Sequence, residues 1–167
     1  MMGLTILGLF HTAISLVALV CGIAALVRDR EISPRNRVGQ VYLVATLITA
    51  VTALGIFQHG GFGPPHALAI MTLGALALGT VAAMLPFFGR ASRIVQAVSY
   101  SSTILFHLIP GVTESSTRLP PGAPLVASAD APVLLAVFGV LLAGFLAGLT
   151  LQIRWLLRTA GQRTLTD

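Results

Sequence analysis

Five long apolar stretches, separated by shorter polar connections, dominate the hydropathy pattern of the chain. Runs of about 20 apolar residues, rising about 1.5 Å per residue as a helix, are long enough to cross a hydrocarbon core of about 30 Å. The fourth stretch is the most dilute, because Gln96, Ser99, Ser101 and Ser102 interrupt it. The pattern predicts transmembrane helices at residues 3–27, 38–58, 66–88, 94–112 and 132–153.

We therefore predict an all-α fold, a polytopic membrane helix bundle forming a single transmembrane domain over residues 1–167. Composition agrees, since 56% of the residues are apolar and only 9% are charged, unlike an ordinary soluble domain. Residues 1–27 lack the basic head and small-residue cleavage site of a signal peptide, so we expect a retained helix. Cys21, the only cysteine, is expected to be a small packing residue in that helix.

The basic residues, all arginine, fall almost entirely on one side of this topology. Only Arg118 belongs to the other set of connections. By the positive-inside rule the N-terminus is predicted outside and the C-terminus in the cytoplasm, which requires an odd number of crossings. The expected partner of these arginines is the lipid bilayer of a bacterial cytoplasmic (inner) membrane, and no nucleic acid is expected despite the net charge of +5. The one-sided set is Arg28, Arg30, Arg35, Arg37, Arg90, Arg93, Arg154, Arg158 and Arg163.

The tripeptide Leu-Phe-His occurs twice, and both copies lie inside predicted membrane helices. His11 falls in the outer half of the first helix and His107 in the outer half of the fourth, one turn before Pro110, which is expected to kink or end that helix. His59 ends the second helix, and His66 begins the third. The topology therefore predicts that all four histidines share the outer side.

Helical spacing predicts which way these side chains face. His11 shares a stripe of small residues that favours close helix packing, so it is expected to face protein. Polar stripes on the second and fourth helices should also point into the bundle, forming one polar seam, because lone polar groups are disfavoured in lipid. Tyr42 and Tyr100 are interpreted as packing or interfacial residues, and the threonines as hydrogen-bonding their own helices. The three stripes are Gly8, His11, Ser15, Ala18 and Gly22; Tyr42, Thr46, Thr49 and Thr52; and Gln96, Tyr100, Thr103 and His107.

Neutral imidazoles at one depth could coordinate a transition metal such as zinc, copper or iron, or a b-type haem. For haem we pair His11 with His107, with Arg118 facing a propionate; for a metal ion, His66 becomes the third ligand and one position stays open for water or substrate. No HExxH, CxxCH or paired-cysteine motif supports either. Alternatively, His59 and His66 only bond water or headgroups, and His11 and His107 serve in proton transfer or structural hydrogen bonds.

The longest predicted external connection, residues 113–131, is rich in proline and could cover the histidines. Glu114 and Arg118 are four residues apart and could form a surface ion pair. Alternatively, Glu114 is a catalytic candidate, orienting a ligand histidine or accepting a proton.

The stretches "FHTAISLVALVCGIAALVRDR", "GFGPPHALAIMTLG" and "FHLIPGVTESSTRLP" resemble a family of small bacterial membrane proteins grouped under a domain of unknown function, over residues 9–135. That family implies no activity. In its pattern a histidine often precedes "R..G..Y" before the second helix, whereas this chain has Asn36 there, which would remove an inner-side ligand. A looser similarity to histidine-ligated b561-type membrane cytochromes is an analogy of fold.

Three functions remain open from the sequence. The leading one is an outward-facing histidine cluster that binds a metal ion or haem, redox or hydrolytic. The second is a proton-coupled transporter that uses the polar seam as its pathway. The third is a cofactor-free assembly or scaffold subunit that forms a homo-oligomer, or joins a membrane partner, through small-residue faces such as Gly139, Ala143 and Ala147, or "GFLAG" at 144–148.

Overall fold

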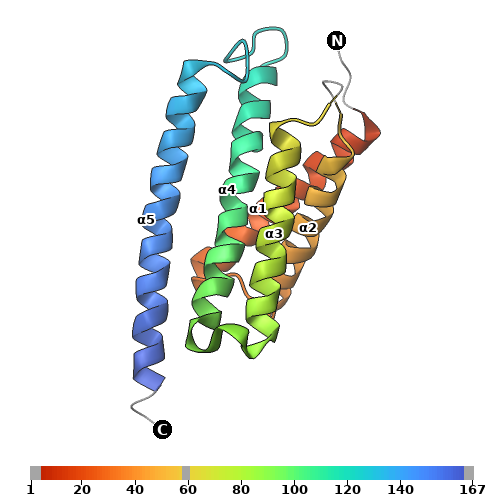
Figure 1. Ribbon diagram of the computed structural model, residues 1–167. Helices are drawn as coiled ribbons and strands as arrows, with labels where there is room; N and C mark the ends of the chain where they lie inside the picture. The colour runs from red at the N-terminus through yellow and green to blue at the C-terminus, as the bar shows by residue number, and fades with distance from the viewer. Residues whose placement is uncertain (1–4, 58–60, 164–167) are drawn as a thin grey trace. The chain divides into compact units, whose positions relative to one another are not determined.

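The structure, a computed structural model, describes residues 5–57 and 61–163. Over these residues its regular secondary structure consists of helices alone, joined by turns and loops (Figure 1). They are α1 (Ile6–Asp29), α2 (Arg37–Leu54), α3 (Pro64–Met84), the 3-10 helix η1 (Pro86–Ala91), α4 (Ser92–Arg118) and α5 (Pro132–Arg163). The chain divides into two compact units, residues 1–104 and residues 105–167, each described here by itself. The predicted all-α class is confirmed for the described residues.

Within the described residues, four helices are long and apolar enough to cross a membrane, namely α1, α2, α3 and residues 132–161 of α5. The prediction of a membrane protein is therefore confirmed at this level. The remaining long helix, α4, is less apolar because it carries buried polar side chains. A helix whose polar face contacts protein has less need of a continuous apolar surface. The buried polar side chains of α4 are Gln96, Ser99, Ser101, Thr103 and His107.

The helix ends follow from local side-chain chemistry. The Thr5 hydroxyl accepts a hydrogen bond from the Gly8 amide at 3.0 Å and caps α1, and Asn36 caps α2 by accepting from the Gly39 amide at 2.8 Å. Such caps satisfy amides that have no partner within the helix. Pro64 occupies the first position of α3, where its missing amide hydrogen costs nothing.

The second, third, fourth and fifth helices do not end where the sequence predicts. The second helix ends at Leu54 instead of residue 58. The third helix ends at Met84 instead of residue 88, because Pro86 follows and cannot continue it. α4 does not end near Pro110 but continues to Arg118, so the connection that follows is shorter than the predicted 113–131. After the proline, the hydroxyl of Thr113 donates to the Ile109 carbonyl at 2.9 Å, and helices in membrane proteins commonly tolerate proline with such help.

The last helix also exceeds its prediction, since α5 runs to Arg163 instead of ending at residue 153. The added turns contain Arg154, Trp155 and Arg158. Arginine is a good helix former in water, so charged residues end a membrane-crossing segment without ending the helix.

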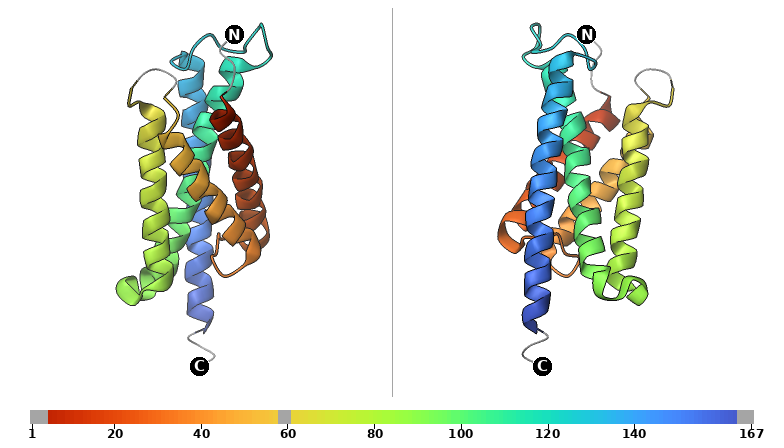
Figure 2. Two further views of the ribbon diagram at one scale, coloured as in Figure 1. Left: turned by 90° about the vertical axis from the view of Figure 1, so that its right-hand side faces the viewer. Right: turned by 60° about the vertical axis from the view of Figure 1, so that its left-hand side comes forward.

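In the first unit, α2 lies between α1 and α3, and successive helices run antiparallel (Figures 1 and 2). The predicted polar stripe of α2 faces inward, because Tyr42 and Thr46 are fully buried and Thr49 nearly so. The hydroxyls of Thr49 and Thr52 donate to carbonyls of their own helix at 2.8 Å, as predicted. The stripe of α1 also faces protein, since Gly8, Ala18 and Gly22 are buried.

Two buried tyrosine rings join the four helices of this unit. Gly22 of α1 lies against the ring of Tyr42, and Gly79 of α3 lies against the ring of Tyr100, so closely that a Cβ at either glycine would overlap ring carbons. The Tyr42 hydroxyl hydrogen-bonds Thr103 of α4, and the Tyr100 hydroxyl lies 3.2 Å from the Thr80 hydroxyl. Glycine therefore lets each aromatic ring approach the neighbouring backbone.

Gly79→Ala should destabilise the protein by about 1–3 kcal/mol, because the added methyl group overlaps a packed aromatic ring. Gly74→Ala in the same helix is the matched control, since a Cβ there has no neighbour within 4 Å. Unfolding in mild detergent, followed by circular dichroism, measures both. Equal stability of the two variants would contradict the ring-on-glycine packing.

Candidate functional site

His11, a predicted metal or haem ligand, is hydrogen-bonded through its Nδ1 to the Thr52 hydroxyl oxygen of α2 at 3.0 Å. The Thr52 hydroxyl has one hydrogen, which it donates to the Ile48 carbonyl at 2.8 Å. Nδ1 of His11 is therefore the donor in this hydrogen-bond pattern, and the ring lone pair is on Nε2. This tautomer is also the one in which a metal-ligating histidine is oriented by a neighbouring acceptor.

His66, the predicted third ligand, lies in the first turn of α3 between two aromatic rings. Its ring centroid is 4.6 Å from that of Phe57 and 5.2 Å from that of Phe62. Its Nδ1 accepts a hydrogen bond from the Gly63 amide at 3.2 Å, so in the neutral ring the proton is on Nε2. Nε2 is buried and has no partner among the described residues. This arrangement suits helix capping better than metal ligation, because the ring lone pair that a metal would need, on Nδ1, already accepts the Gly63 hydrogen bond.

The other two histidines, His107 and His59, are not described together with His11 and His66. His107 is buried in α4 and belongs to the second unit, and His59 lies outside the described residues. Among the residues that the structure describes, no three His, Cys, Asp or Glu side chains are grouped so that they could hold a metal ion. The site built from His11, His66 and His107 therefore remains a prediction.

Glu114 and Arg118 form an ion pair on the last turns of α4, as the surface interpretation of their spacing predicted. They lie on a helix and not in a loop, because α4 continues past Pro110. The catalytic role of Glu114 and the propionate contact of Arg118 remain predictions.

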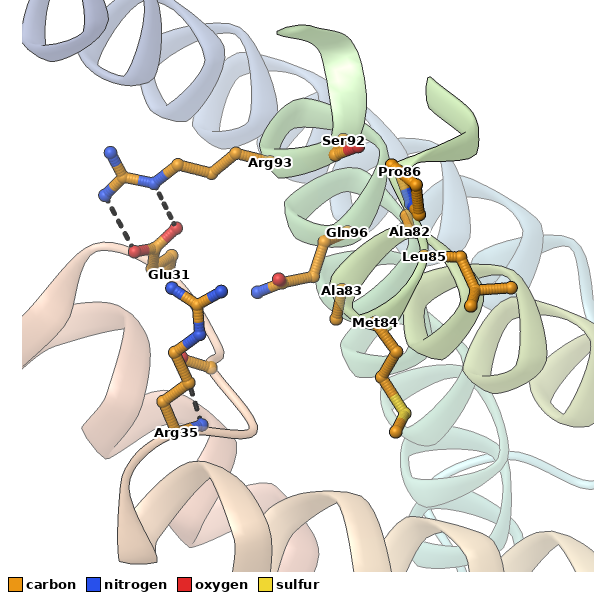
Figure 3. A pocket seen from close by; sticks show the side chains of 11 residues that line it. Glu31, Arg35, Ala82, Ala83, Met84, Leu85, Pro86, Ser92, Arg93 and Gln96 are labelled. Carbon is orange, nitrogen blue, oxygen red and sulfur yellow. Dashed lines mark hydrogen bonds and ion pairs between the residues drawn. The ribbon is translucent and has the colours of Figure 1, made fainter. Parts of the chain in front are cut away.

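The first unit contains a pocket at its arginine-rich end, by which we mean the end where α1 and α3 finish and α2 and α4 begin. Its cavity volume is about 380 Å³. Three segments build it: the connection between α1 and α2 and, about 50 residues later in the sequence, the end of α3 with Pro86 and the first turns of α4 (Figure 3). The lining residues are Glu31, Ser33, Arg35, Ala82, Ala83, Met84, Leu85, Pro86, Ser92, Arg93 and Gln96.

An ion pair closes one side of this pocket. The Arg93 guanidinium donates two hydrogen bonds to the Glu31 carboxylate, one from Nε at 3.1 Å and one from Nη2 at 2.8 Å (Figure 3). Both side chains are partly shielded, with exposed fractions of 34% for Arg93 and 16% for Glu31. Two parallel bonds of this kind fix the geometry of both groups.

The connection between α1 and α2 is held in place at several points. Ile32 is fully buried, and the Gln96 side-chain amide donates to its carbonyl oxygen at 3.2 Å. Gly39 of α2 lies directly against the backbone of Ser33, where any Cβ would collide with the Ser33 carbonyl. These contacts place the charged side chains of the connection over the start of α4.

Arg35 differs from Arg93 in having no acidic partner within residues 5–57 and 61–163. Its side chain extends into the pocket, with the guanidinium turned toward Gln96 (Figure 3). Its backbone amide donates to the Ser33 hydroxyl at 3.2 Å. In the described part of the chain the Arg35 guanidinium has no hydrogen bond or ion pair, so its donors are available to a ligand.

The opposite wall of the pocket is apolar. It consists of the last turn of α3 and Pro86, and its large side chains are well exposed, at 76% for Met84 and 54% for Leu85. The first residues of α4, Ser92 and Arg93, complete the lining between the two walls. Ser92 follows η1 directly, and its backbone amide already donates to the Gly89 carbonyl, so the polar side chains of the lining are what is left for a ligand.

This pocket was not predicted from the sequence. The arginines were expected to flank the helices and touch lipid headgroups, and Gln96 was expected in the polar seam. The available signal was Glu31, a lone glutamate among four nearby arginines, together with Arg93 and Gln96 one turn apart at a helix start. Nothing in that signal says that the two segments meet.

Comparisons with protein-family models, with curated proteins and with solved structures found no match. The resemblances noted from the sequence therefore remain expectations, and the candidate function rests on the geometry of the pocket.

Proposed function

We propose that the protein is a multi-pass membrane protein that binds a phosphate-bearing anion in the pocket at its arginine-rich end. The observation that carries this proposal is the Arg35 guanidinium, which extends into a cavity of about 380 Å³ and lacks an acidic partner among the described residues. The cavity is also lined by Ser92 and Arg93 at the start of a long helix.

The chemistry of the lining suits a phosphate group. A guanidinium presents a planar fork of donors that matches two phosphate oxygens. The hydroxyls of Ser33 and Ser92 line the same cavity and could donate to further oxygens.

The Glu31 carboxylate would compete with an entering phosphate for the Arg93 guanidinium. This carboxylate already accepts both hydrogen bonds from Arg93. An entering phosphate would share Arg93 with Glu31, and the two negative groups would repel each other. Arg35 is therefore the main anchor, and Glu31 limits the affinity.

The membrane orientation is part of the same proposal. Five crossings, with α4 as the fourth, place the N-terminus outside and the C-terminus in the cytoplasm of a bacterium. The positions of nine of the ten arginines support this orientation. The pocket would then lie at the cytoplasmic face of the inner membrane.

Cysteine labelling tests the orientation. In a Cys21→Ala background expressed in a bacterial host, Ala123→Cys should react with a membrane-impermeant maleimide in intact spheroplasts. Ala91→Cys, which is equally exposed but lies next to Arg90 and Arg93, should react only after permeabilisation. The reverse pattern would reject the proposed orientation.

Calorimetric titration with glycerol phosphate tests the pocket. Arg35→Gln should weaken binding at least about tenfold, since a hydrogen bond to a charged group contributes about 1.5–3 kcal/mol. Arg37→Gln is the matched control, because Arg37 is exposed, carries the same charge and does not line the cavity. Glu31→Gln should strengthen binding by removing the competing carboxylate. Equal effects at residues 35 and 37 would mean that only general charge attracts the anion.

A second candidate function is the predicted binding of a metal ion or haem, and the Nδ1–H tautomer of His11 favours it. Purified protein would then contain stoichiometric metal by elemental analysis, with a Soret band if the metal is haem. His11→Ala should abolish the signal and His59→Ala should leave it. Protein without metal or haem after expression in supplemented medium would reject this candidate. The carrier and scaffold alternatives remain predictions.

A further inference from the structure

We propose that the phosphate in this pocket belongs to an anionic phospholipid of the surrounding leaflet, a deeper claim that rests on the proposed anion site. The charged wall would hold the phosphodiester, and the apolar wall at the end of α3 would hold the glycerol backbone and the first acyl carbons. The pocket would thus be a specific lipid site, distinct from general attraction of lipid to surface arginines.

The two walls have the polarity of a lipid at the membrane boundary. Glu31, Arg35 and Arg93 lie on one side of the cavity, and the last turn of α3 lies on the other (Figure 3). That turn ends a helix long and apolar enough to span a membrane, so it falls where headgroups give way to hydrocarbon. A free phosphate ion would contact only the charged side and would leave Met84 and Leu85 without a contact to the ligand.

The charge of the pocket indicates which lipid class fits. Arg35 and Arg93 contribute two positive charges and Glu31 one negative charge, which leaves a net charge of +1. A single negative charge on a phosphodiester neutralises this, whereas a zwitterionic lipid brings its own cation next to two arginines. The pocket therefore fits a monoanionic lipid of the phosphatidylglycerol type.

The neighbouring arginines would help to supply this ligand. Arg28, Arg30, Arg37 and Arg90 flank the same end of the unit without lining the cavity. Basic residues near a membrane surface enrich anionic lipid around themselves. These four arginines would raise the local concentration of anionic lipid, and the pocket would bind and orient one lipid molecule.

The test is a titration of the detergent-purified full chain, with bound lipid counted by native mass spectrometry. The probes are phosphatidylglycerol, phosphatidylcholine with the same acyl chains, and glycerophosphoglycerol, which is the deacylated headgroup. We expect one saturable phosphatidylglycerol, bound about tenfold or more tightly than either other probe. Arg35→Gln should cost about tenfold, and Arg37→Gln less than about twofold.

The apolar wall is tested separately by Met84→Ser and Leu85→Ser, whose exposed side chains make no core contribution to folding. Both should weaken phosphatidylglycerol several-fold and leave glycerophosphoglycerol unchanged. If the deacylated headgroup binds as tightly as the lipid, or the serine variants change nothing, the ligand is a soluble anion and only the lipid proposal fails. If phosphatidylcholine binds equally well, the charge argument fails. If no probe saturates and residues 35 and 37 behave alike, the anion site fails as well.

Discussion

The packing of the first unit depends on two tyrosine rings that lie directly against glycine residues of neighbouring helices. Tyr42 and Tyr100 are large, buried and polar at one end, so each needs both close packing and a hydrogen-bond partner. Gly22 and Gly79 supply the first requirement, and threonine hydroxyls supply the second. Because the rings come from α2 and α4 and the glycines from α1 and α3, one arrangement ties four helices together.

The two ends of that unit carry different kinds of polar group. At one end, His11 is paired with a threonine that is itself bonded to its helix. At the arginine-rich end, positive charge exceeds negative charge around a cavity, and Arg35 has no counter-charge among the residues that the structure describes. Surplus positive charge beside a cavity attracts an anionic ligand, and the arginine-rich end therefore has the property that a binding site for such a ligand requires.

Sequence reasoning was accurate where one helix decides the outcome and failed where several segments meet. Helical spacing correctly placed Tyr42 and Thr46 on an inward face, because a 3.6-residue period and the exclusion of polar groups from lipid act within one helix. The predicted end of α4 was wrong because a proline removes only one backbone hydrogen bond, and groups in neighbouring turns can compensate for that loss. The pocket was missed because residues some 60 positions apart, such as Glu31 and Arg93, meet only through the path of the connection after α1. No local pattern encodes that path.

Gly39 shows how far from a ligand the determinants of a binding pocket can lie. Its missing side chain allows the Ser33 backbone to rest on α2, and that resting position aims Glu31 and Arg35 over α4. A methyl group at this position would push the connection between α1 and α2 away from α2. Both charged groups would move with it. Sequence drift in such proteins should therefore be freer at the arginines that touch only solvent than at this one uncharged residue, which touches no ligand at all.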